Sequence, residues 1–306
     1  MKMNYSVLMS VYEKENADHF AAAVESMLCQ SCPPTQFVIV CDGPLTTALD
    51  KVILGFTAAH PSLFRILRLS ENRGLGLALR EGLSVCDCQL VARMDSDDIA
   101  LPLRMEHQLK AISTDPHLAV VGGQIAEFID DPKNIQGYRM VPVSPNEIRQ
   151  RAVKRNPMNH MTVLFRKDAV LAAGGYQDMK GLEDYFLWGR MLASGFRLAN
   201  LPEICVLVRT TELQTRRGGW NYFRQTVRLE RALRACGLMG MGDYYENLLV
   251  RFCGTVLLPS GLRQRVYQRY LRQKPAPGIP WAGTLPKMSE VWFADDKDSN
   301  QRMTIL

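Results

Sequence analysis

The first hundred residues alternate short apolar runs with longer segments of helical periodicity, and this alternation constrains the fold more than any other feature. A run of four to eight apolar residues is typical of a buried strand, and a period near 3.6 is typical of a helix. Strands separated by helices at this spacing indicate a parallel sheet with helices on both faces. The strands are predicted at 5–10, 36–41, 64–69 and 89–94, and the helices at 17–29, 46–59 and 75–84.

Polar residues follow each of these four strands. In open α/β sheets ligands bind at the carboxyl ends of the strands, so these residues are expected to gather at one edge and form a site. The polar residues after the strand ends are Tyr12 and Glu13, Asp42, Asn72 and Arg73, and Asp95 to Asp98.

The strongest chemical signal is the acidic stretch after the fourth strand, Arg93-Met94-Asp95-Ser96-Asp97-Asp98. Carboxylates this close repel one another, and a bound cation relieves the repulsion. A hard divalent ion takes oxygen ligands and bridges protein carboxylates to substrate phosphates. The stretch therefore indicates a metal–diphosphate site. A solvated acidic turn or a helix N-cap is the alternative interpretation.

The rest of the chain continues with helices and strands up to a boundary near Gly218-Gly219. The region 125–140 is expected to be a polar hairpin or loop, and the segment after residue 222 is expected to be helical to about Lys274. Helices are predicted at 102–113, 146–153, 168–173 and 182–194, and strands at 118–122, 162–165, 196–200 and 204–209.

Charge is unevenly distributed along the 306 residues. The segment from Arg216 to Lys274 holds 12 Lys/Arg against 3 Asp/Glu, a net charge of +9, in a chain whose total is +6. Such a segment indicates an anionic partner: a membrane surface, a nucleic acid or phosphate groups. Residues 262–273 have the pattern of an interfacial amphipathic helix, although this face could instead pack on the protein. Aromatic and basic residues do not interleave as in RNA readers, so no nucleic acid is expected.

No signal peptide and no apolar run of 18 residues is recognised, which leads us to expect a cytoplasmic protein. The eight cysteines lack the spacing of a zinc site and are expected to be free thiols, as in a reducing compartment.

The ordered set of motifs resembles family 2 glycosyltransferases of the GT-A fold. The resemblance covers roughly residues 5–209 and is greatest to bacterial enzymes of capsule, exopolysaccharide and O-antigen synthesis, the amylovoran type among them. It implies an α/β fold, a Rossmann-like mixed sheet flanked by helices, with a C-terminal helical extension. The motifs are Ser6–Tyr12, Asp42-Gly43, Asn72–Ala78, Arg93–Asp98 and Gly181–Tyr185.

The resemblance also implies roles for individual residues. A UDP-sugar would be held by Ser10, Val11, Tyr12, Glu13 and Asp42 at the uracil and ribose, and by Arg73 and Gly74 near the nucleotide. Asp95 and Asp97 would form the family's DxD motif at the metal, either Mn²⁺ or Mg²⁺, and Asp98 would assist them or cap a helix. Asp184 would be the catalytic base. Glu183, His160, Asn159 and Arg209 would lie near the acceptor or the diphosphate.

The implied reaction is an inverting transfer of one sugar from a UDP-sugar to a glycan or lipid-linked oligosaccharide acceptor. Residues 1–215 would form the catalytic domain, divided into a nucleotide-sugar half (1–100) and an acceptor half (101–215). Residues 216–274 would form a basic helical extension that could dock on the anionic inner face of the plasma membrane. Residues 275–306 would be a flexible tail.

Three other classes of protein share parts of this pattern. A Rossmann-type oxidoreductase needs its glycine motif after the first strand, but Gly74-Leu75-Gly76 follows the third. A phosphatase-like hydrolase needs its DxD motif after the first strand. A non-catalytic protein that binds nucleotide or scaffolds an assembly complex stays open as the alternative, and turnover would decide between them.

Overall fold

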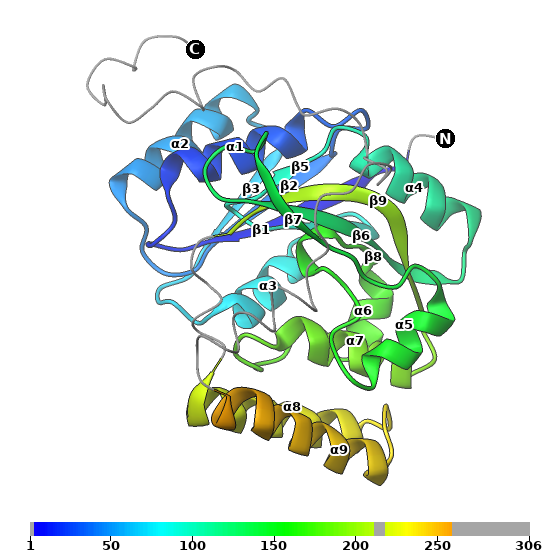
Figure 1. The fold of residues 1–306 in the computed structure, drawn as a ribbon. Helices are drawn as coiled ribbons and strands as arrows, with labels where there is room; N and C mark the ends of the chain where they lie inside the picture. The colour runs from blue at the N-terminus through cyan, green and yellow to red at the C-terminus, as the bar shows by residue number, and fades with distance from the viewer. Residues whose placement is uncertain (1–2, 211–217, 259–306) are drawn as a thin grey trace.

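The computed structural model describes residues 3–210 and 218–258 (Figure 1). Four parallel strands form the first half of the sheet, in the spatial order β3-β2-β1-β4. The prediction of these strands and of the helices between them is confirmed. In chain order the elements are β1 (Tyr5–Val11), α1 (Ala17–Leu28), β2 (Gln36–Cys41), α2 (Thr47–Ala59), β3 (Phe64–Arg68), α3 (Leu75–Ser84) and β4 (Leu90–Met94).

The second half of the sheet is mixed, as the resemblance implied. β8 joins β4 and β6 in antiparallel pairing, β6 and β9 run parallel, and β7 and β5 add antiparallel partners at the side. The elements are β5 (Ile99–Ala100), α4 (Arg104–Thr114), β6 (Leu118–Phe128), β7 (Ile135–Arg139), α5 (Pro145–Ala152), the 3-10 turn η1 (His160–Thr162), β8 (Leu164–Arg166), α6 (Lys167–Ala172), α7 (Glu183–Ala193) and β9 (Arg197–Arg209).

Two strand predictions in this half were wrong. The segments predicted as separate strands at 196–200 and 204–209 form one strand, β9, which carries the irregular stretch around Pro202 as a bulge. Asn200 pairs with Gly122 and Ile204 pairs with Gln124, so β9 has two more residues than β6 across this step. β6 extends six residues beyond its predicted end, to Phe128, and then forms a hairpin with β7. The two-residue strand β5 was not predicted, because so short a strand has no periodicity.

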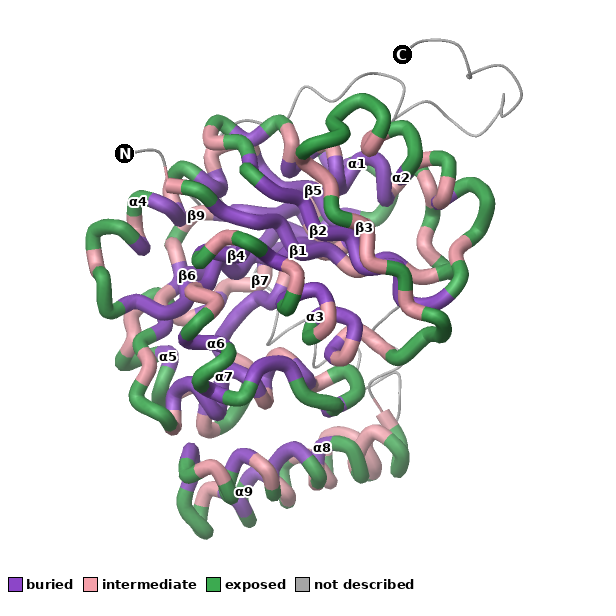
Figure 2. The backbone as a smooth tube through the Cα atoms, turned by 180° about the vertical axis from the view of Figure 1, so that it is seen from behind, coloured by how far each residue is buried: buried purple, intermediate pink, exposed green. Residues whose placement is uncertain are grey.

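Helices cover both faces of the sheet (Figures 1 and 2). Each face has its own apolar core. Alternate residues of a strand point to opposite faces, so Val7 and Met9 enter one core and Leu8 the other. The first core lies under α1, α2 and α4, and the second lies under α3, α5, α6 and α7.

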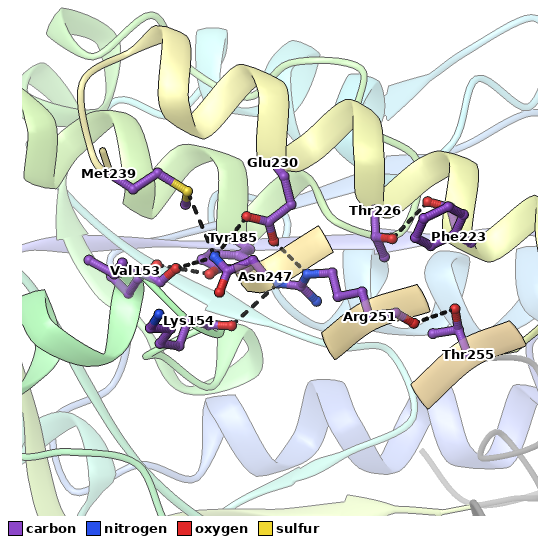
Figure 3. A network of polar contacts seen from close by, with 11 residues as sticks. Val153, Lys154, Tyr185, Phe223, Thr226, Glu230, Met239, Asn247, Arg251 and Thr255 are labelled. Carbon is purple, nitrogen blue, oxygen red and sulfur yellow. Dashed lines mark hydrogen bonds and ion pairs between the residues drawn. The ribbon is translucent and has the colours of Figure 1, made fainter. Parts of the chain in front are cut away.

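The C-terminal helices α8 (Gly219–Ala235) and α9 (Met241–Phe252), followed by the π-helical turn η3 (Cys253–Leu257), pack on the second core. Gly189 of α7 allows the close approach of α8, because a Cβ atom at that position would lie 2.2 Å from Cδ2 of Leu233. The buried carboxylate of Glu230 accepts hydrogen bonds from Arg251 (2.5 Å) and Asn247 (3.0 Å), and Asn247 also donates to the carbonyl of Val153 (Figure 3).

The predicted amphipathic helix at 262–273 and the predicted tail at 275–306 lie outside the described residues. All eight cysteines are free, as predicted. Of the helices in the described ranges, none combines the length and the apolar character needed to span a bilayer.

Candidate active site

The carboxyl ends of β1 to β4 surround a cavity of about 260 Å³, here called the β1–β4 cavity. The convergence expected from the sequence is therefore present. Its lining residues come from the end of β1, the loops after the four strands and the start of α3, and are Ser10, Tyr12, Glu15, Asp42, Asn72, Gly74, Leu75, Asp95, Ser96 and Asp97.

Asp42 shapes one wall of this cavity through the backbone. Its two carboxylate oxygens accept hydrogen bonds from the backbone N–H groups of Arg73 (2.7 Å) and Gly74 (3.0 Å). Gly74 has a φ of +85°, which glycine adopts without strain, and it is the N-cap of α3. The side chain of Arg73 lies 3.6 Å from Glu81 and does not line the cavity.

Of the β1 loop residues, Val11 is buried in the first core and Glu13 is exposed. Neither lines the cavity, whereas Glu15 does. The charges of Asp97 and Asp95 together with burial, the largest cause, raise the pKa of the Glu15 carboxyl to about 7. The β1 loop therefore brings a third carboxyl group to the acidic turn.

The acidic turn itself is held by two buried arginines. Arg93 forms an ion pair with Oδ1 of Asp95. Arg104 of α4 is fully buried and donates a hydrogen bond of 2.8 Å to the carbonyl of Arg93, which fixes the end of β4. Burial and the charge of Asp95 raise the pKa of Asp97 to about 6. Closely spaced carboxyl groups with raised pKa values are a typical environment for a cation.

The donor set fits Mg²⁺ or Mn²⁺ in part. Asp95 and Asp97 present hard oxygen atoms to the cavity. In the part of the chain that the structure describes, no group of three or more His, Cys, Asp or Glu side chains is arranged to hold a metal ion by itself. A site with two protein carboxylates that is completed by substrate phosphates and water is the arrangement Mg²⁺ commonly uses.

Asp98 and Arg209 lie beside this turn. Asp98 is buried, and its Oδ1 accepts a hydrogen bond of 2.9 Å from the backbone N–H of Arg209, so it joins the turn to β9. Burial raises the pKa of Asp98 well above its usual range. The guanidinium of Arg209 stacks 4.7 Å from the ring centre of Phe128 and donates to the carbonyl of Asp97.

A second cavity of about 360 Å³, here called the α5–α7 cavity, shares Leu75 and Asp95 with the first. It contains Glu183 and Asp184 from the start of α7. Its remaining lining residues are Arg93, Arg139, Val141, Arg151, Arg155, Asn156, Met158, His160, Met161, Gly181, Leu182, Tyr185, Tyr222 and Arg251.

The two acidic residues of this cavity differ in environment. Asp184 is partly exposed, and its Oδ2 accepts a hydrogen bond of 2.6 Å from the amide of Asn156. Glu183 is 6% exposed, and burial together with the charge of Asp184 raises its pKa to about 7. Asp184 is thus the more accessible carboxylate and the one oriented by a neighbouring amide.

His160 lines the α5–α7 cavity, but Asn159 does not. The Nε2 atom of His160 lies 2.9 Å from the hydroxyl of Tyr176, and burial together with the charge of Arg93 lowers its pKa well below the usual range. His160 is therefore a neutral hydrogen-bonding group. Asn159 accepts a hydrogen bond of 2.5 Å from Nε of Arg139 and positions that arginine.

Several lining residues were not found by sequence reasoning. Glu15 lies in the same polar loop as Glu13, and the sequence does not indicate which of them faces inward. Asn156 stands alone between helices and carries no motif. Arg151, Arg155 and Arg251 resemble surface arginines in sequence and come together only through packing.

Comparison with known proteins shows the family of this chain. The pattern described as Glycosyl transferase family 2 matches residues 6–172. An uncharacterized glycosyltransferase of Haemophilus influenzae is 41% identical over 89% of this chain and 100% of its own length. The amylovoran biosynthesis glycosyltransferase AmsE of Erwinia amylovora is 37% identical over 87% and 98%. The UDP-Gal:alpha-D-GlcNAc-diphosphoundecaprenol beta-1,3-galactosyltransferase of Escherichia coli is 30% identical over 88% and 97%.

Solved structures share the GT-A fold at low identity. S. aureus TarS 1-349 in complex with UDP-GlcNAc has a TM-score of 0.62 and 15% identity, covering 88% of this chain and 76% of that one. The mannosyltransferase PcManGT from Pyrobaculum calidifontis, in complex with GDP-Man and Mn²⁺, has a TM-score of 0.60 and 14% identity, covering 88% and 74%. The mixed sheet with helices on both faces is the fold that these proteins have in common with this chain.

Proposed function

This chain belongs to glycosyl transferase family 2, and we propose that it transfers a single sugar from a UDP-sugar to a lipid-linked glycan with inversion at the anomeric carbon. The observation that carries the proposal is the pair of adjoining cavities: one contains the acidic turn, the other contains Asp184, and Asp95 lines both. A donor and an acceptor in these two cavities would meet at Asp95.

The β1–β4 cavity is proposed to hold the nucleotide. Tyr12 and Asn72 offer hydrogen-bonding groups for base and ribose, and the loop fixed by Asp42 forms the wall beside them. Asp95 and Asp97 would hold a divalent ion, which when bound stabilises negative charge on the diphosphate of the donor. The Mn²⁺ named in the PcManGT complex supports this assignment.

Asp184 is proposed as the base. Its carboxylate would accept the proton of the acceptor hydroxyl while that oxygen attacks the anomeric carbon, and the bond between this carbon and the phosphate oxygen breaks as UDP leaves. Asn156 fixes the carboxylate by its hydrogen bond of 2.6 Å. The proposed base and the proposed diphosphate site lie in different cavities. We therefore favour attack from the side opposite to the diphosphate, and such an attack inverts the configuration at the anomeric carbon.

The lipid-linked acceptor is supported by the E. coli relative, whose name specifies a diphosphoundecaprenol-linked sugar. Such an acceptor places the reaction at a membrane, and we propose the cytoplasmic face. The C-terminal helices expose large apolar side chains on one part of the protein: Trp220 is 58% exposed, and Leu249 and Val250 are each 63% exposed. Together with the positive charge of this segment, these side chains suit an anionic bilayer surface.

Membrane docking is tested by sedimentation with vesicles containing phosphatidylglycerol at low and high salt. Leu249→Glu should reduce binding, and absence of wild-type binding at low salt would remove the docking proposal while leaving the transfer reaction untouched.

Turnover is tested by UDP release from a panel of UDP-sugars with and without Mn²⁺, using wild type, Asp97→Ala and Asp184→Ala. Slow hydrolysis of one donor that depends on metal and is lost in Asp97→Ala is expected. Addition of a lipid-diphosphate-linked sugar should accelerate UDP release in wild type but not in Asp184→Ala. A wild type that neither binds nor turns over any UDP-sugar would contradict the proposal.

A further inference from the structure

Arginines outnumber carboxyl groups in the α5–α7 cavity. Five arginines line it, against Asp95, Glu183 and Asp184. They come from four parts of the fold: Arg93 from β4, Arg139 from the end of β7, Arg151 and Arg155 from α5 and the residues after it, and Arg251 from α9.

Two of these arginines are fixed in place by buried partners. Arg139 donates to Asn159 at 2.5 Å. Arg251 donates to the buried carboxylate of Glu230, also at 2.5 Å (Figure 3). Positions fixed before a ligand arrives reduce the ordering cost of binding.

The other arginines retain binding capacity. Nε and Nη1 of Arg93 and Nε of Arg151 are buried and have no hydrogen-bond partner among the described residues. Within the same residues, no carboxylate forms an ion pair with Arg151 or Arg155. Burial, followed by the charges of Arg155 and Arg139, lowers the pKa of Arg151. Arg151 and Arg155 are therefore like charges in one cavity with no carboxylate ion pair among the described residues. A bound anion stabilises such charges, and guanidinium groups suit phosphate oxygens.

We propose that Arg139, Arg151, Arg155 and Arg251 bind the diphosphate group that joins the acceptor glycan to its lipid. This proposal rests on the proposed function, because the sugar next to that diphosphate would then lie toward Asp184. The donor diphosphate is assigned to the acidic turn in the β1–β4 cavity, which adjoins the α5–α7 cavity at Asp95. The C-terminal helices thus contribute Arg251 and Tyr222 to acceptor recognition.

The test measures two ligands separately by calorimetry. UDP with Mg²⁺ probes the donor cavity, and farnesyl diphosphate, added to protein saturated with UDP and Mg²⁺, probes the arginines. Arg151→Ala and Arg155→Ala should each lower the affinity for farnesyl diphosphate at least tenfold. Both variants should keep a UDP affinity within twofold of that of wild type. Arg231→Ala, an exposed arginine of α8 that lines neither cavity, is the matched control. Arg155→Lys keeps the positive charge and should lose less affinity for farnesyl diphosphate than Arg155→Ala.

Three outcomes would overturn the proposal: no binding of farnesyl diphosphate to wild type, equal binding by wild type and both alanine variants, or loss of UDP affinity in parallel, which would assign these arginines to the donor. UDP-sugar turnover, measured on the same samples, separates the two proposals. If farnesyl diphosphate binding depends on the arginines but no UDP-sugar is turned over, the anion site is supported and the donor assignment is contradicted. If a UDP-sugar is turned over but farnesyl diphosphate binding does not depend on the arginines, only the anion site is contradicted.

Discussion

The side-chain amide of Asn156 donates a hydrogen bond of 2.6 Å to Oδ2 of Asp184 at the start of α7. The two residues are 28 positions apart in sequence, and only Asp184 belongs to a recognisable motif. The contact makes Asn156 a positioning residue for the proposed base.

Replacement of Asn156 by Ala should lower kcat about tenfold, because loss of one hydrogen bond to a charged group costs about 1.5 kcal/mol. Asp184→Ala should lower kcat about 10²- to 10⁴-fold, the usual range for a general base. The KM for the UDP-sugar should stay unchanged in both variants. Steady-state kinetics with saturating acceptor provide the measurement, and an Asn156→Ala enzyme with full kcat would remove its positioning role.

Glu15 and Glu13 offer a matched pair in one loop. Glu15→Gln should weaken the apparent affinity for Mn²⁺ several-fold, because it removes a carboxyl group whose pKa responds to both Asp95 and Asp97. Glu13→Gln, at an exposed position outside the cavity, should leave metal affinity unchanged. Metal-activation curves of UDP release make the comparison, and equal effects of both substitutions would contradict the inward position of Glu15.

Asp42→Asn should lower both stability and UDP affinity. An amide offers only one acceptor oxygen, so one of the two backbone N–H groups, of Arg73 or Gly74, loses its partner. Both hydrogen bonds are partly buried, and loss of a hydrogen bond to a charged group costs about 1.5–3 kcal/mol. Urea unfolding and UDP calorimetry measure the two effects. Asp50→Asn, which removes the partly exposed ion pair with Arg68, is the control and should cost at most about 1 kcal/mol.

The stability of the protein should depend on pH through Glu183. Its carboxyl has a pKa of about 7 in the folded state and about 4.5 when unfolded, so between these values the folded state holds a proton that the unfolded chain has released. Stability from this group is therefore complete below pH 4.5 and declines as pH rises through 7. Relative to Glu183→Gln, the free energy of unfolding of wild type should fall by about 3 kcal/mol as the pH rises across this range. Urea unfolding at pH 5, 6, 7 and 8 measures the loss, and parallel curves for the two proteins would contradict it.

Gly189→Ala should destabilise the protein by about 1–3 kcal/mol, because the added Cβ atom would overlap Leu233 of α8. Leu233→Ala alone should also destabilise, because this leucine is fully buried, and the double variant should lose less than the sum of the two single variants. Gly242→Ala is the matched control in α9: its Cβ would meet no atom within 4 Å, and it should stabilise by about 0.4–1 kcal/mol. Thermal unfolding of the four variants gives the sign of each change in stability. A Gly189→Ala protein as stable as wild type would show that α8 can move away from α7 without cost.

The sequence was sufficient to predict the first four strands, because their apolar runs and intervening helices have clear periods. It also predicted that the acidic turn meets Asp42 at one edge of the sheet. β9 was divided around Pro202 in the prediction from sequence, because the pairing with β6 that joins the two runs across a bulge of β9 is a contact between distant segments. Asn156 and Arg251 could not be assigned to a site, because their positions depend on the packing of α5, α7 and α9 and no local pattern records that packing.

Asp95 lines both cavities, and this shared wall has a thermodynamic consequence. A ligand that changes the position or charge state of Asp95 from one side changes what the other side presents to its own ligand. By linkage, the factor by which bound UDP alters acceptor affinity must equal the factor by which bound acceptor alters UDP affinity. Any coupling between the two substrates through this single carboxylate is therefore the same whichever of them binds first.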